Sequence, residues 1–96
     1  MADLRRRADA AVQADDYEGA AELYTRAIGA TAAADGSMDS SLYTNRAWCY
    51  ANMLPPRHDQ VVKDCDAALA VDPLNAMAIL RRAVASQALK DQSAGN

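Results

Sequence analysis

Apolar residues recur along the chain at intervals of three and four, which places them on one face of an α-helix. The pattern predicts helices over residues 2–14, 17–32, 59–71 and 75–90, and another that begins near Ser40 and stops before Leu54. No segment alternates with a period of two for long enough to form a strand. We therefore predict an all-α fold of five helices.

Turn-forming and helix-breaking residues separate the predicted helices. Asp15-Asp16 form a tight turn, and residues 35–39 have the composition of a loop. Pro55-Pro56 and Asp72-Pro73 end helices because proline lacks an amide N–H and disfavours the helical conformation of the residue before it. We expect the last residues, 92–96, to fray.

The helical pattern also repeats, with offsets of 41, 39 and 36 residues. The matched sets are Tyr24-Ala27-Ile28 with Cys65-Ala68-Leu69, Leu4-Ala8-Ala11 with Tyr43-Ala47-Tyr50, and Tyr43-Ala47-Tyr50 with Ile79-Ala83-Ser86. A helix-turn-helix repeat of about 34 residues explains these offsets if one loop and one turn carry short insertions. We predict a single domain, residues 1–91, with repeats at about 2–34 and 40–73 and the first helix of a third at about 75–90.

Three stretches match the second helix of a known repeat. They are Asp16-Tyr17-Glu18-Gly19-Ala20, Tyr24-Thr25-Arg26-Ala27-Ile28 and Asp64-Cys65-Asp66-Ala67-Ala68-Leu69, the last closing on Val71-Asp72-Pro73. Through them, about residues 3–90 resemble the tetratricopeptide repeat family. The resemblance implies a right-handed superhelix of antiparallel helix pairs, in which the first helix of each repeat lines a concave groove. Such grooves hold an extended peptide or a partner helix.

Leu42-Tyr43-Thr44-Asn45-Arg46-Ala47 and Ala78-Ile79-Leu80-Arg81-Arg82-Ala83 are similar to stretches of a chaperone-docking subfamily. That subfamily includes co-chaperones and a mitochondrial import receptor, and it binds the acidic C-terminal tails of heat-shock chaperones through a two-carboxylate clamp. Cations and amide N–H groups suit this role because they donate charge-assisted hydrogen bonds to carboxylates. The resemblance implies peptide-binding positions at Arg5, Asp9, Asn45, Met77 and Arg81, and further groove positions at Val12, Gln13 and Cys49.

The implied clamp departs from the family pattern at two positions. Asp9 stands where asparagine is expected, and Met77 stands where a second lysine is expected. Asp9 would either repel a ligand carboxylate or pair with Arg5 one turn away and withdraw it from the ligand. Arg6 or Arg82 could compensate. We therefore expect a degenerate clamp with weakened or altered ligand preference.

Composition and charge narrow the possible partners. The 96 residues carry a formal net charge of −3, which argues against binding to nucleic acid or to an anionic membrane. About a quarter of the residues are alanine, which favours closely packed helices. The chain shows no signal peptide and no apolar run of membrane-spanning length. We expect a cytoplasmic domain, or one at the cytosolic face of an organelle within a longer protein.

No set of residues indicates catalysis, a cofactor or a metal. Cys49, Cys65 and His58 lack the spacing of a zinc site, and two cysteines are too few for a disulfide framework. We find no nucleophile–base pair and no phosphate-binding loop, so we expect no enzyme. We interpret both cysteines as core residues, Trp48 as an inter-helix packing residue, and His58 as a loop or helix-start residue.

Two functions remain open at this point. One is an adaptor that docks a protein or an acidic C-terminal peptide, such as a heat-shock chaperone tail, through Arg5, Asn45 and Arg81. The other is an assembly scaffold with no carboxylate recognition, in which Asn45-Arg46-Ala47 is only a packing motif. The last helix should stay partly uncovered, so we expect a longer protein or self-association. Its uncovered residues would be Ile79, Leu80, Val84 and Leu89.

Overall fold

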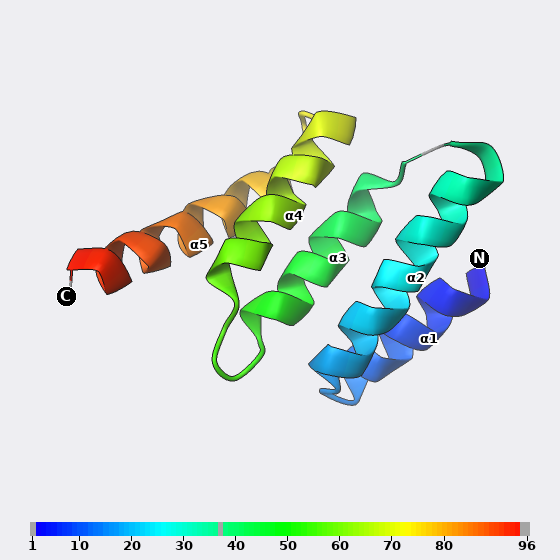
Figure 1. Ribbon diagram of the computed structural model, residues 1–96, viewed down its shortest axis with the longest axis horizontal. Coiled ribbons are helices and arrows are strands. Elements are labelled where there is room, and N and C mark those ends of the chain that lie inside the picture. The colour runs from blue at the N-terminus through cyan, green and yellow to red at the C-terminus, as the bar shows by residue number, and fades with distance from the viewer. Residues whose placement is uncertain (1, 37, 95–96) are drawn as a thin grey trace.

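The computed structural model describes residues 2–36 and 38–94 of the chain. It contains five helices: α1 (Ala2–Gln13), α2 (Tyr17–Asp35), α3 (Ser40–Ala51), α4 (His58–Val71) and α5 (Ala76–Ala94). Each helix packs against the next one in the chain, consecutive helices run in opposite directions, and α3 also contacts α5 (Figure 1). The described residues contain no strand, which confirms the predicted all-α fold. None of these helices combines the length and the apolar character that crossing a membrane requires.

Capping residues fix both ends of α2. The Asp16 carboxylate accepts a hydrogen bond from the amide of Gly19 (3.0 Å), and a Cβ on Gly19 would collide with that carboxylate, so the cap depends on glycine here. At the other end, Gly36 adopts a φ of 72° and its amide donates to the carbonyl of Ala32 (2.9 Å). This cap lies after Asp35, so α2 extends past its predicted end at residue 32.

The limits of α5 also differ from the prediction. Asn75 is not the first helical residue; its side-chain oxygen accepts a hydrogen bond from the amide of Ala78 (3.1 Å) at the start of the helix. The helix continues to Ala94, so residues 92–94 of the predicted frayed tail are helical. Residues 95–96 of that tail lie outside the described residues.

The core consists largely of small side chains at the helix crossings. Ile28 and Tyr50 pack against both of its clusters, one formed by α1–α3 and the other by α3–α5. Ala8 and Ala47, which the repeat pattern matched, are both fully buried, because alanine lets neighbouring helices approach closely. Their counterpart on α5, Ala83, is exposed.

The exposed side of α5 carries large apolar residues, as expected from the sequence. Ile79, Leu80 and Val84 are 53%, 57% and 61% exposed, and Leu89 is partly buried. No described helix covers the side of α5 on which Ile79 lies. Ile79, Leu80 and Val84 therefore leave apolar surface of α5 open to solvent.

A buried ion pair joins the middle of the molecule. Arg46 on α3 donates two hydrogen bonds to the Asp64 carboxylate on α4 (2.6 and 2.8 Å) and one to the hydroxyl of Thr25 on α2 (3.1 Å). Its guanidinium carbon lies 5.7 and 5.9 Å from the ring centroids of Tyr43 and Tyr50. The hydrogen bonds to Asp64 raise the pKa of Arg46 above its ordinary value. Arg46 therefore fixes α3 between α2 and α4.

Candidate functional site

A pocket of about 310 Å³ lies where α1, α3 and α5 face one another. Five of the predicted peptide-binding or groove positions line it: Asp9, Val12, Gln13, Asn45 and Arg81. Tyr24 and Trp48 complete the lining. The helical repeat thus brings together residues that are up to 72 positions apart in the sequence, from Asp9 to Arg81.

Arg81 is the cation of this pocket. Its guanidinium carbon stacks 4.5 Å from the ring centroid of Trp48. Burial lowers the pKa of Arg81 from its ordinary value. Its Nε is buried without a hydrogen-bond partner, and none of the ion pairs among the described residues includes Arg81. A partly buried guanidinium without a carboxylate partner is suited to binding an anionic ligand.

Asn45 lines the same pocket as Arg81. The next residue, Arg46, points elsewhere, toward Asp64 on α4. No hydrogen bond of the Asn45 side chain is found within residues 2–36 and 38–94, so its amide group is available to a ligand in the pocket.

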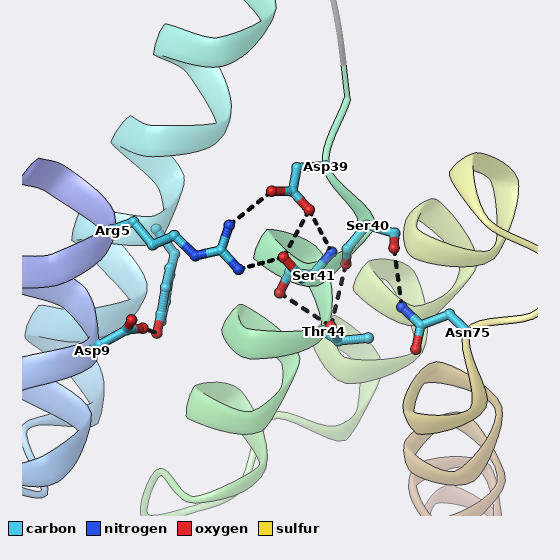
Figure 2. Close-up of polar contacts among 8 residues, drawn as sticks. Arg5, Asp9, Asp39, Ser40, Ser41, Thr44 and Asn75 are labelled. Atoms are coloured by element: carbon cyan, nitrogen blue, oxygen red, sulfur yellow. Dashed lines mark hydrogen bonds and ion pairs between the residues drawn. The ribbon is translucent and has the colours of Figure 1, made fainter. Parts of the chain in front are cut away.

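Asp9 supplies the negative charge of the pocket. Its carboxylate accepts a hydrogen bond from the hydroxyl of Tyr24, a side chain that is otherwise buried. Burial, and then this hydrogen bond, raise the pKa of Tyr24. The pairing of Asp9 with Arg5 considered from the sequence is wrong. The Arg5 guanidinium turns away from Asp9, toward the beginning of α3 (Figure 2).

Arg5 is held at the edge of the groove instead of in the pocket. Its guanidinium donates to the Asp39 carboxylate (2.8 Å) and to the Ser41 hydroxyl (2.5 Å). Burial alone would raise the pKa of Asp39, but hydrogen bonds from Ser41 and Arg5 outweigh it and lower the pKa. Next to this cluster, the Asn75 amide donates to the Ser40 hydroxyl (3.1 Å; Figure 2). These contacts tie α1 and the cap of α5 to the same end of α3.

The other predicted positions lie elsewhere. Cys49 is fully buried in the core, and burial raises the pKa of its thiol to about 11, which corrects its assignment to the groove surface. Cys65 is buried as well, so the interpretation of both cysteines as core residues is confirmed. Met77 is exposed on α5 but is not among the residues that line the pocket.

The arginines considered as replacements do not reach the pocket either. Arg82 pairs with Asp66 on α4 (3.0 Å), and Arg6 is exposed on α1. Neither residue lines the pocket. Arg81 is therefore the one cation in its lining.

Tyr24 and Trp48 are the lining residues that the sequence reasoning missed. Trp48 follows Asn45 by three positions on α3, and this helical spacing was the available signal. Its half-exposed ring borders both the pocket described above and a second pocket of about 270 Å³. The second pocket has a mostly apolar lining: Trp48, Ala51, His58, Val61, Leu80, Arg81, Val84 and Ala85. A charged site and an apolar site thus share Trp48 and Arg81.

Comparison with known proteins agrees with this architecture. The chain is 40% identical over 80 residues to the mitochondrial import receptor subunit TOM34 of Rattus norvegicus. This alignment covers 80% of the chain and 25% of TOM34. It is 36% identical over 89 residues to the protein SGT1 homolog of Oryza sativa subsp. japonica, covering 93% of the chain and 22% of the relative. The fold is a tetratricopeptide-type helical repeat.

A third relative is the HSP-interacting protein of Zea mays, which is 34% identical over 74 residues, covering 77% of the chain and 10% of that protein. The chain spans a quarter or less of the length of each of these three relatives. No protein-family model and no solved structure matches the chain.

Proposed function

We propose that this helical repeat is a protein-interaction adaptor that docks the C-terminal end of a peptide in the groove of α1, α3 and α5. Arg81 carries the proposal, because it is a partly buried cation with no ion pair to the rest of the described chain. The relatives include a mitochondrial import receptor subunit and an HSP-interacting protein. The acidic tail of a heat-shock chaperone is therefore the first ligand to test.

The proposed contacts follow from the two pockets. The peptide carboxylate accepts charge-assisted hydrogen bonds from Arg81 and a hydrogen bond from Asn45, of which the charged ones contribute about 1.5–3 kcal/mol each. Stacking on Trp48 orients the guanidinium before the ligand arrives, which reduces the entropy lost on binding. An apolar side chain upstream of the carboxylate enters the second pocket against Leu80 and Val84.

The groove is less cationic than the two-carboxylate clamp that the resemblance implies. Arg5 is paired with Asp39, Met77 stands at a lysine position, and Asp9 adds a negative charge. We therefore propose an altered clamp, in which Arg81 and Asn45 hold one carboxylate and no second cation holds another.

Titration of isotope-labelled protein with a peptide ending in Glu-Glu-Val-Asp tests the proposal. We expect salt-sensitive chemical-shift changes on α1, α3 and α5. These changes should disappear when the C-terminus of the peptide is amidated, and also when the protein carries Arg81→Ala. Arg82→Ala is the matched control, because Arg82 is the next residue on the same helix but pairs with Asp66 outside both pockets. Absence of shift changes on these helices at saturating peptide would contradict docking of the chaperone tail.

The alternative function is an assembly scaffold with no carboxylate recognition, which the exposed apolar residues of α5 favour. The double substitution Asp9→Asn with Met77→Lys distinguishes the two functions, since it restores the family residues at both positions. If the wild type binds the peptide, the double variant should bind it about tenfold tighter or more. Strong binding by the double variant alone would instead favour the scaffold.

A further inference from the structure

We propose that the groove selects a C-terminal peptide whose last residue is basic, because Asp9 and Arg81 present opposite charges to the same pocket. This inference rests on the proposed function and specifies its ligand. The terminal carboxylate lies on Arg81 and Asn45, and the ammonium or guanidinium of the last side chain lies on Asp9.

The position of Asp9 supports this assignment. Tyr24 donates a hydrogen bond to one carboxylate oxygen, and a neutral hydroxyl fixes the carboxylate without cancelling its charge. Arg5 is one turn away on α1, but it is paired with Asp39. Among the ion pairs of the described residues, none includes Asp9, and its side chain is exposed to the groove.

The balance of charge in the pocket gives the preference. Asp9 and Arg81 are the charged residues of its lining; the others are Val12, Gln13, Tyr24, Asn45 and Trp48. A last residue with an acidic side chain gains one attraction and meets one repulsion, whereas a basic last residue gains two attractions. Repulsion by Asp9 is thus a means of rejecting acidic ends, and attraction by Asp9 is a means of selecting basic ones.

Asp9 and Arg81 line the same pocket, so a single terminal residue can meet both charges. The volume of this pocket, about 310 Å³, accommodates a terminal residue and its side chain. The preceding apolar residue then continues past Trp48 into the second pocket. A single C-terminal segment of a partner protein occupies both sites in this arrangement.

Three fluorescent peptides that differ only in the last residue, Asp, Asn or Lys, test the inference by anisotropy titration. An exposed charge pair changes affinity by up to about fivefold, so replacing repulsion with attraction predicts that the Lys peptide binds about tenfold tighter than the Asp peptide. The Asn peptide should be intermediate. The preference should shrink at high salt, and amidation of the Lys peptide should abolish its binding.

Asp9→Asn tests the residue directly, because asparagine keeps an acceptor for the Tyr24 hydroxyl but has no charge. The variant should lose the preference for Lys over Asp. Asp91→Asn removes the same charge from an exposed position outside both pockets, and it should keep the preference. Tightest binding of the Asp peptide to the wild type would overturn this inference alone, whereas failure of all three peptides to bind would overturn the proposed function as well.

Discussion

Replacing Asp64 by alanine should destabilise the repeat strongly, because it leaves Arg46 buried without its carboxylate. The Arg46 side chain is only 18% exposed and that of Asp64 only 5%, and hydrogen bonds of 2.6 and 2.8 Å join them. Removing one partner of such a pair costs about 3–5 kcal/mol. We expect the lower end, about 3 kcal/mol, because Arg46 keeps its hydrogen bond to Thr25 and its two aromatic neighbours.

This loss is large relative to the stability of a domain of this size. At roughly 0.05–0.15 kcal/mol per residue, the free energy of unfolding is about 5–14 kcal/mol. A loss of about 3 kcal/mol lowers the thermal midpoint by roughly 12–24 °C. Asp66→Ala is the matched control on the same helix: its pair with Arg82 (3.0 Å) is 53% and 52% exposed, so its loss should cost less than about 1 kcal/mol.

Urea unfolding followed by far-ultraviolet circular dichroism measures both costs. A third variant, Arg46→Met with Asp64→Leu, removes both charges and should recover most of the stability, because the penalty comes from the unpaired cation. If Asp64→Ala costs no more than Asp66→Ala, the ion pair does not fix α3 between its neighbours and the reasoning is refuted.

Three further predictions concern other parts of the molecule. Asp39→Asn should lower the urea midpoint at neutral pH. The difference in midpoint from wild type should fade as the pH falls below about 4, because the folded pKa of Asp39 lies below its ordinary 3.8. A difference in midpoint that is independent of pH would count against the pairing with Arg5. Cys49 and Cys65 should react with a thiol reagent only as fast as the protein unfolds, since burial raises both pKa values to about 11; rapid labelling of the folded protein would show that they are accessible. The exposed face of α5 should cause concentration-dependent association in light scattering that Ile79→Glu reduces, and a wild-type monomer at every concentration would argue against it.

The helices were predictable because their signals are local. Apolar spacing, Asp-Pro and Pro-Pro pairs identified five segments within a few residues of the observed limits. The repeat pattern also identified Ala8 and Ala47 as equivalent positions, and both are fully buried. What sequence spacing could not specify was where α2 ends and where α5 begins, because these limits depend on the caps at Gly36 and Asn75. The spacing also stopped short of the end of α5 at Ala94.

The candidate site was less predictable because it depends on contacts between distant residues. Arg5 and Asp39 are 34 positions apart, and their pairing requires the α2–α3 loop to end beside α1. The stacking of Arg81 on Trp48 likewise joins α5 to α3 across 33 positions. A family pattern assigns roles position by position, so it contains no information about a neighbour such as Asp39 that is outside the pattern.

Adjacent residues of α3 show how finely these roles are divided. From the sequence, Asn45-Arg46-Ala47 was open to interpretation as a clamp motif or as a packing motif. Arg46 and Ala47 face the interior, toward Asp64 and the helix crossings, while Asn45 lines the pocket. Retention of the whole motif is therefore weak support for ligand binding, because two of its three residues stabilise the fold.

The pairing of Arg5 with Asp39 changes what the charge of the groove implies. The five positions matched to the family clamp carry two positive charges and one negative charge in the sequence. The structure directs Arg5 to Asp39, so one positive and one negative charge remain in the pocket. A groove with one positive and one negative charge cannot favour a peptide C-terminus with two carboxylates by electrostatics alone. It can favour a C-terminal residue that carries both a carboxylate and a cationic side chain. In the function that we propose, the ion pair between Arg5 and Asp39 changes the class of C-terminal ligand, because it removes a cation from the binding surface.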